Sequence, residues 1–290
     1  MAIKIIAEAV SNLFKPILKK KNSDIRVINM HLTIGDKSYN CYEDDIDIEE
    51  FSKTYYEMMK EGKEVKTSLV NPNEYEAIFK EEIEKGNQVI CFTMASGISG
   101  TYQSACIARD IVNEEYKEEK VAVIDSITAG FGEGLQALHA EELVKEGKSF
   151  KEVKEASEAY KHLVRSDFTV GDIKYLLKTG RVSKYVVKFV NALNFRVMLK
   201  NSEEAKIAFA GIVKGKAASI RKLFKTVSEK IDRSIKQIVY ITHCNCLDDA
   251  NELKDLLNKD GINDVEIYYY DLISGAHIGP GSLAVFYKAA

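Results

Sequence analysis

The chain has 290 residues, 46% of them hydrophobic, so it can bury a sizeable core, and its length favours two domains. Its net charge of −3 argues against general electrostatic binding of nucleic acid or of an anionic membrane surface. No apolar run approaches the roughly 20 residues needed to cross a bilayer, so no membrane span is expected.

The first apolar segment, Ile3 to Ala7, is predicted to form a strand and not a signal peptide. Glu8 interrupts it, and the basic residues Lys15 and Lys19 to Lys21 follow it, whereas a signal peptide carries its basic residues first. The five cysteines are an odd number without framework spacing, which fits a reducing compartment. We expect a cytoplasmic protein in which three cysteines are small buried or ordinary thiols: Cys41, Cys91 and Cys106.

Apolar runs typical of strands alternate with helical spacing through the first half of the chain. Further strands, one or two in the first range, are predicted at Asp24 to Ile34, Gln88 to Thr93 and Lys120 to Asp125. Helices are predicted between the strands at Ile48 to Lys60, Pro72 to Lys85, Gly100 to Asn113 and Gly130 to Glu146. These repeated strand-then-helix units predict an α/β domain with a mostly parallel sheet flanked by helices.

The run Ser96 to Ala105 follows the strand-like segment Val89 to Thr93 and predicts a hydroxyl-rich glycine turn that leads into a helix. Gly97 and Gly100 allow tight geometry and close backbone approach, and the start of the helix presents unpaired N–H groups beside several hydroxyls. Such a turn can hold an oxygen-rich anion. Ser99 or Thr101 can equally be a helix cap, and this stretch alone does not separate the two interpretations.

The second half of the chain changes character near Tyr160 to Asp167. Strands are predicted at Phe168 to Val170, Ile207 to Ala210, Gln237 to Thr242 and Val265 to Tyr270, with helices at Lys216 to Ile231 and Asp248 to Asn258. We predict two α/β domains, residues 1–165 and 166–290, the second with a mixed sheet. Because no Pro- or Ser-rich linker joins them, the domains should pack tightly and share a ligand cleft.

A second glycine-rich turn is predicted at Ser274 to Ser282, with His277 between glycine hinges. A lone histidine is more often structural than functional, but a loop on a rigid scaffold is where binding groups usually lie. The segment His243 to Cys246 lacks a second metal-ligand pair, so a structural loop is favoured and no metal is expected. The basic clusters, Lys19 to Lys21 and Lys214 to Lys225, are expected to be solvated helix faces.

Five dispersed motifs together resemble the DegV family of fatty-acid-binding proteins. Their order and spacing match along nearly the whole chain, which is far more specific than any single motif. The motifs are Thr67-Ser68, Ser96 to Ser104, Val123 to Ser126, Tyr175 to Ser183 and His277 to Gly281.

The resemblance implies a non-enzymatic carrier with two α/β domains and an acyl chain buried where they meet. It places the fatty-acid carboxylate at Thr67, Ser96 and His277, with Ser68, Gly97 and Ser99 as second choices nearby. It further implies that a separate fatty-acid kinase phosphorylates the bound acid, and no cofactor is expected. Arg181 is either a solvated cation at a helix end or a contact for a partner or a phosphate.

Two segments depart from the family pattern. Ala7 to Val10 stands where the family has a Thr-Asp-Ser-Thr-like segment, and Leu69-Val70 replaces a Gln-Pro pair. If the first strand's hydroxyls shape the head-group site, their loss predicts a different ligand, a different way of holding it or weaker engagement of the partner. Two alternatives to the fatty-acid carrier stay open: a serine hydrolase that acts on acyl esters with Ser96 and His277, or a carrier of another apolar anion. Against the hydrolase, Thr101 stands where the motif of a serine-hydrolase elbow requires glycine.

Overall fold

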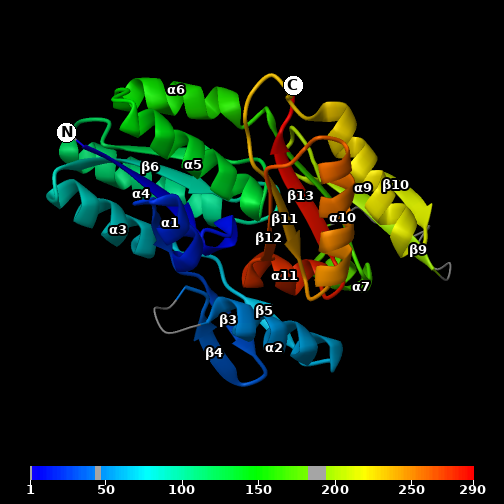
Figure 1. The fold of residues 1–290 in the computed structure, drawn as a ribbon. Coiled ribbons are helices and arrows are strands. Elements are labelled where there is room, and N and C mark those ends of the chain that lie inside the picture. Colours follow the sequence, from blue (N-terminus) through cyan, green and yellow to red (C-terminus); the bar gives the residue numbers. More distant parts are fainter. Residues whose placement is uncertain (1, 43–46, 182–193) are drawn as a thin grey trace.

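The computed structural model describes residues 2–42, 47–181 and 194–290, which form two large sheets and one small sheet (Figure 1). The first sheet has four strands in the order β2-β1-β6-β7, all parallel. The bounds are β1 Ala2–Glu8, β2 Arg26–Ile28, β6 Asn87–Thr93 and β7 Val121–Asp125. The predicted parallel sheet is therefore confirmed.

Helices cover both faces of the first sheet. α5 (Phe131–Lys145) and α6 (Phe150–Tyr160) lie on one face, and α3 (Pro72–Glu84) and α4 (Thr101–Tyr116) lie on the other (Figure 1). Capping boxes start α3 at Asn71 and α6 at Ser149, because each side chain accepts a hydrogen bond from the N–H three residues later. α6 was not predicted from the sequence.

The second sheet has six strands in the order β10-β9-β8-β13-β11-β12. β11 and β12 are parallel and the other pairs are antiparallel, which confirms the predicted mixed sheet. The strands are β8 Val164–Thr169, β9 Phe195–Asn201, β10 Ile207–Lys214, β11 Val239–His243, β12 Val265–Tyr269 and β13 Leu283–Lys288. Two helices, α9 (Lys216–Lys230) and α10 (Leu247–Lys259), pack on this sheet and bury a core of their own against it.

A small antiparallel sheet in the order β4-β3-β5 lies beside α2 (Ile48–Lys60) and apart from the large sheets (Figure 1). Its strands are β3 His31–Ile34, β4 Lys37–Asn40 and β5 Val65–Thr67. β4 and β5 were not predicted, because three or four half-exposed residues leave no strand periodicity. The remaining elements are η1 Ala9–Ser11, α1 Lys15–Lys21, α7 Lys174–Thr179 and α11 Leu272–Ile278.

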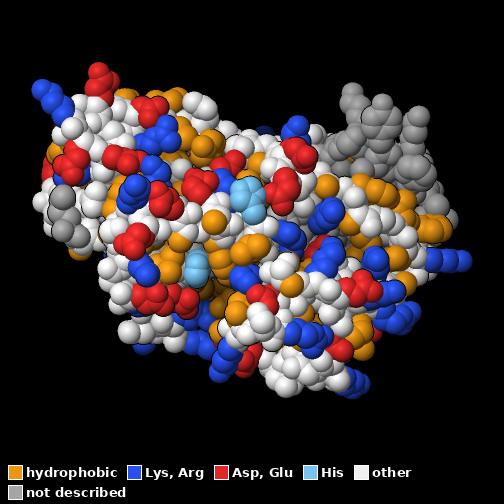
Figure 2. Space-filling view, turned by 90° about the horizontal axis from the view of Figure 1, so that it is seen from above, with side chains coloured by type: hydrophobic (Ala, Val, Ile, Leu, Met, Phe, Trp, Pro, Cys, Tyr) orange, Lys and Arg blue, Asp and Glu red, His pale blue; other side chains and the backbone are white. Residues whose placement is uncertain are grey.

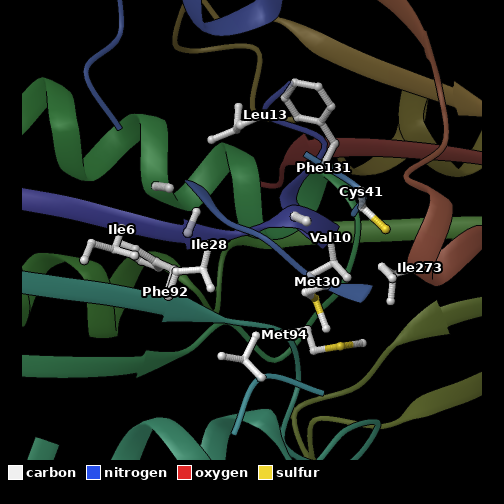
Figure 3. Close-up of a cluster of buried hydrophobic side chains, with 14 of the residues drawn as sticks. Ile6, Val10, Leu13, Ile28, Met30, Cys41, Phe92, Met94, Phe131 and Ile273 are labelled. Atoms are coloured by element: carbon white, nitrogen blue, oxygen red, sulfur yellow. The ribbon is translucent and has the colours of Figure 1, made fainter. Parts of the chain in front are cut away.

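One continuous hydrophobic core joins the two large sheets. Figure 3 shows part of it, where side chains of the first sheet gather with Phe131 of α5 and Ile273 of α11. Phe131 also stacks on Tyr240 of the second sheet, with ring centroids 3.9 Å apart. The predicted buried cysteines Cys41, Cys91 and Cys106 are indeed buried and free. The two halves are therefore packed tightly, as the missing linker predicted.

The surface does not concentrate one sign of charge on the face seen in Figure 2, where basic and acidic side chains are interspersed. Ion pairs occur among the described residues, such as that of Lys80 with Glu115 at 2.6 Å. Across the described ranges, no helix has both the length and the apolar character needed to cross a membrane.

Candidate functional site

A narrow cavity lies between the two large sheets and is partly open, so that its roughly 510 Å³ of empty space includes open solvent. The first half of the chain contributes the residues that follow strands β6 and β7, among them Met94 and Ala129. The second half contributes Phe168 of β8 and Tyr270, which precedes α11. Because β6 and β7 are parallel, their carboxyl ends meet at one sheet edge, where ligands of α/β proteins usually bind.

Two polar side chains that line this cavity, His277 and Arg181, contact each other, and Thr67, which is not a lining residue, contacts His277. The Oγ1 atom of Thr67 lies 3.0 Å from Nε2 of His277, and Nη1 of Arg181 lies 3.5 Å from Nδ1 of the same ring. The Nε of Arg181 donates a hydrogen bond to the Ile98 carbonyl at 3.2 Å. A guanidinium can only donate, so Nδ1 of His277 accepts and Nε2 carries the proton that is donated to Thr67. This arrangement leaves the Thr67 hydroxyl proton free for a ligand oxygen.

The charges of this group favour an anion. Burial, and then the nearby Arg181 charge, lower the pKa of His277 to about 4, so the ring is neutral at pH 7. Burial also lowers the pKa of Arg181, and no acidic side chain of the described residues pairs with the guanidinium. A half-buried cation without a protein anion is costly, and an anionic ligand would compensate it.

His277 lies in the last turn of α11, so the predicted loop around it is wrong. Asp271 begins this helix by accepting a hydrogen bond from the Ser274 N–H at 2.6 Å, and Gly279 ends it with a φ of 76°. Gly275 allows the ring of Tyr56 to pack against the helix, where a Cβ atom would clash with the phenol. The short helix therefore depends on tertiary contacts that its glycine-rich sequence conceals.

The turn between β6 and α4 is held at both ends by Glu8, which is completely buried at the end of β1. One carboxylate oxygen of Glu8 accepts from the Met94 N–H at 2.8 Å, before the turn. The other accepts from the hydroxyl groups of Tyr75 and of Thr101, the first residue of α4. The departure from the family pattern at Ala7 to Val10 thus removes hydroxyls, whereas Glu8 stands where that pattern has an aspartate and supplies a carboxylate that fixes this turn.

Two further buried acids lie near Glu8. Glu133 accepts the Glu8 N–H at 2.8 Å through Oε1, while neither Oε2 of Glu133 nor Oδ2 of Asp271 has a hydrogen-bond partner in the described part of the chain. Burial raises the pKa of all three carboxyl groups, the pKa of Asp271 to about 8. The Glu8 charge raises the pKa of Glu133 further. Asp271 is therefore mainly protonated at pH 7.

The structure brings Thr67, His277 and Arg181 together, although Thr67 and His277 are 210 residues apart. Ser96 is exposed on the turn, where its N–H donates to Asp125 Oδ1 at 3.2 Å, and it is not among the cavity-lining residues. Met94 and Ile98 are the residues of this turn that line the cavity.

The second-choice residues lie around the same turn. Ser68 is exposed beyond β5, and the Ser99 hydroxyl accepts the Thr101 N–H at 3.4 Å, as a local cap would. A Cβ atom at Gly97 would lie 2.5 Å from the Ala205 carbonyl, which confirms the predicted close backbone approach. Val182 and Ser183 of the fourth motif lie outside the described residues.

The segment His243 to Cys246 joins β11 to α10, and Nδ1 of His243 accepts the Cys246 N–H at 3.3 Å. Among residues 2–42, 47–181 and 194–290, no group of three or more His, Cys, Asp or Glu side chains could hold a metal ion. Sequence reasoning missed the cavity residues Met94, Phe168, Tyr270 and Ser274, which lie in apolar runs or at element ends without a distinguishing signal.

A family model described as uncharacterised proteins of the DegV family matches residues 2–290. A DegV domain-containing protein of Clostridium perfringens is 29% identical over 284 residues, which cover 98% of this chain and 96% of that protein. Two solved structures share the fold. One, a fatty-acid-binding DegV family protein from Thermus thermophilus, has a TM-score of 0.84 at 20% identity and full coverage of both chains. The other is the Streptococcus pneumoniae Fatty Acid Kinase (Fak) B3 protein loaded with linoleic acid, with a TM-score of 0.81 at 22% identity and full coverage of both chains.

Proposed function

Because the chain belongs to the DegV family, we propose that it binds a long-chain fatty acid such as palmitate between its two domains and presents the carboxylate. One observation carries the proposal: a mainly apolar cavity is lined by Arg181 and by His277, whose ring is hydrogen-bonded to Thr67, and the guanidinium has no anionic partner in the described ranges. The bound fatty acids named for similar folds support it.

The two parts of a fatty acid match the two parts of the cavity. Burial of a tail of about 16 carbons contributes on the order of 10 kcal/mol at about 0.8 kcal/mol per CH₂, partly offset by association and ordering costs. The carboxylate must be hydrogen-bonded, because a buried unpaired charge is costly. The Thr67 hydroxyl donates to it, since the ring of His277 occupies the acceptor side of that hydroxyl. Arg181 fixes the tautomer of the ring and supplies positive charge.

We infer that a fatty-acid kinase is the partner, as the name of the pneumococcal relative suggests for that protein. Ser96 is exposed beside the cavity-lining Ile98, so its hydroxyl is open to a carboxylate or to a partner that reaches the head group. Arg181 would contact both the carboxylate of the ligand and this partner. The proposal includes the cytoplasmic location predicted from the sequence.

The purified protein is expected to carry long-chain fatty acid at a substantial fraction of one molecule per chain, because the apolar cavity retains the tail. Native mass spectrometry should detect the adduct, and extraction should identify its chain length. Recovery of no acyl chain, together with no uptake of added palmitate or oleate, would count decisively against the proposal.

The protein is expected to be a carrier and not a hydrolase. Nε2 of His277 is engaged by Thr67, and the structure gives no hydrogen bond between His277 and Ser96 that would activate a serine nucleophile. We expect no turnover of p-nitrophenyl acyl esters and no fluorophosphonate adduct. Labelling of Ser96 that disappears in His277→Ala would contradict this prediction.

A further inference from the structure

The charged residues that line the cavity are all basic. Arg181, Lys200 and Lys206 lie in its wall, and no aspartate or glutamate of the described residues does. The chain as a whole has more acidic than basic residues, 44 against 41, so its composition does not explain this selection. The wall therefore presents only positive charge, which favours an anionic ligand.

Lys206 lies at an opening of this cavity. Among the lining residues that the structure describes, only Lys200 and Lys206 are exposed. Arg181 and His277 are half-buried, and others such as Phe168 are buried. An exposed side chain can line a cavity only where the cavity meets solvent. A ligand that comes in through this opening therefore meets Lys206 before it reaches Arg181.

The turn between β9 and β10 holds Lys206 against the turn between β6 and α4. The Lys206 carbonyl accepts the Ser202 N–H at 3.0 Å, and the Lys206 N–H donates to Ser202 Oγ at 3.3 Å. Ala205 is buried with a left-handed φ of 56°, and its carbonyl lies against Gly97. A Cβ atom at Gly97 would lie 2.8 Å from Cγ of Lys206, so the lysine stem packs on this glycine. Arg181 donates to the carbonyl of the next residue, so both cations contact the same turn.

No ion pair neutralises Lys206 within the described ranges. Lys200 differs, because it lies opposite the buried Asp167 in the register of β8 and β9. Glu204 is near Lys206, but it is exposed and does not line the cavity. Its pKa is lowered mainly by the Ser202 hydroxyl and to a smaller extent by the Lys206 charge. The Lys206 ammonium is therefore available to the carboxylate of an incoming ligand.

We propose that Lys206 captures the fatty acid at the opening: its charge draws the ligand carboxylate to the cavity, where Arg181 and His277 then hold it. This inference rests on the proposed function and assigns the uptake step of the same site to a residue of the second domain. A charge on the rim of a site chiefly changes the association rate and its salt dependence, whereas a charge buried in the site chiefly changes the dissociation rate.

The test follows binding of cis-parinarate, a fatty acid whose fluorescence rises in an apolar site, to delipidated protein by stopped flow. Lys214→Met is the matched control for Lys206→Met, because Lys214 is an exposed lysine outside the cavity lining, about 25 Å away along β10. At 10 mM NaCl, where the Debye length is about 30 Å, Lys206→Met should associate about three- to tenfold more slowly than the wild type. Its dissociation rate should stay within about twofold, and Lys214→Met should keep the wild-type association rate.

At 1 M NaCl, where the Debye length is about 3 Å, the wild type and Lys206→Met should associate at the same rate. Lys206→Glu should be the slowest of the variants at low salt and should gain most from added salt. Equal association rates of the wild type and Lys206→Met at low salt, or a deficit that persists at high salt, would overturn the inference and leave fatty-acid binding intact. Absence of parinarate binding by the wild type would contradict the proposed function itself.

Discussion

Replacing Arg181 with methionine is expected to lower the affinity for palmitate about 10- to 100-fold, because a hydrogen bond to a charged group contributes about 1.5–3 kcal/mol. Methionine keeps the apolar stem in the cavity wall but removes the positive charge. It also removes the donor that orients the His277 ring, so the ring no longer presents Nε2–H to Thr67 reliably. Isothermal titration of delipidated protein with palmitate measures the effect.

Arg109→Met is the control for Arg181→Met. Arg109 lies on α4, pairs with Asp110 at 2.8 Å and does not line the cavity, so its replacement should leave affinity unchanged. Arg181→Lys should fall between wild type and Arg181→Met, since it keeps the charge but not the planar guanidinium. Unchanged affinity in Arg181→Met would remove Arg181 from the carboxylate site.

The free energy of unfolding is expected to fall by about 2 kcal/mol between pH 6.5 and 8.5 through Asp271 alone. Its folded pKa of about 8 lies above its unfolded value, so its contribution is fully present below pH 4 and is lost as pH rises through 8. Glu133 adds to the loss in the same direction. Burial lowers the pKa of His277 and of His243. A histidine whose folded pKa is lowered stabilises the fold above its unfolded pKa, and this stabilisation is lost as pH falls below about 6.5, outside this window.

Urea unfolding of Asp271→Asn at the two pH values isolates this contribution. Asparagine can cap α11 as aspartate does, but it is neutral at every pH, so the difference between pH 6.5 and 8.5 should shrink by about 2 kcal/mol. Asp255→Asn changes an exposed carboxylate on α10 and should retain the wild-type difference. The same pH difference in wild type and Asp271→Asn would show that Asp271 is not the titrating group.

The elements predicted from the sequence are those in which apolar residues recur at regular spacing over a long segment. α2 was predicted at its observed bounds, Ile48–Lys60, and the strands of the first sheet were placed within a few residues. β9 was missed because its exposed ends obscure the buried Val197 to Leu199. α11 was interpreted as a loop because two glycines and a proline suggest a turn, and its stability comes from Tyr56 and Asp271, which local propensity does not include.

The site could be predicted only in part. Thr67 and His277 were selected by resemblance, since no spacing rule relates side chains from β5 and α11. Ser96 was grouped with them, but the structure leaves it exposed and gives it no hydrogen bond to either, so its place at the carboxylate stays a prediction. The segment Ala7 to Val10 was interpreted only as a loss of hydroxyls, because only the folded chain shows that the Glu8 carboxylate reaches Met94 and Thr101.

The attachment of the β6–α4 turn to Glu8 limits how this turn can be reused. A segment cut out as Met94 to Thr101 and transplanted into another scaffold would leave behind the Glu8 carboxylate that holds Met94 at its start and Thr101 at its end. The hydroxyl groups of the turn would then no longer be held in the positions that they have in this protein. An engineer who wishes to move this turn must carry β1 with it, so the smallest transferable unit comprises two adjacent parallel strands, β1 and β6, and the start of α4.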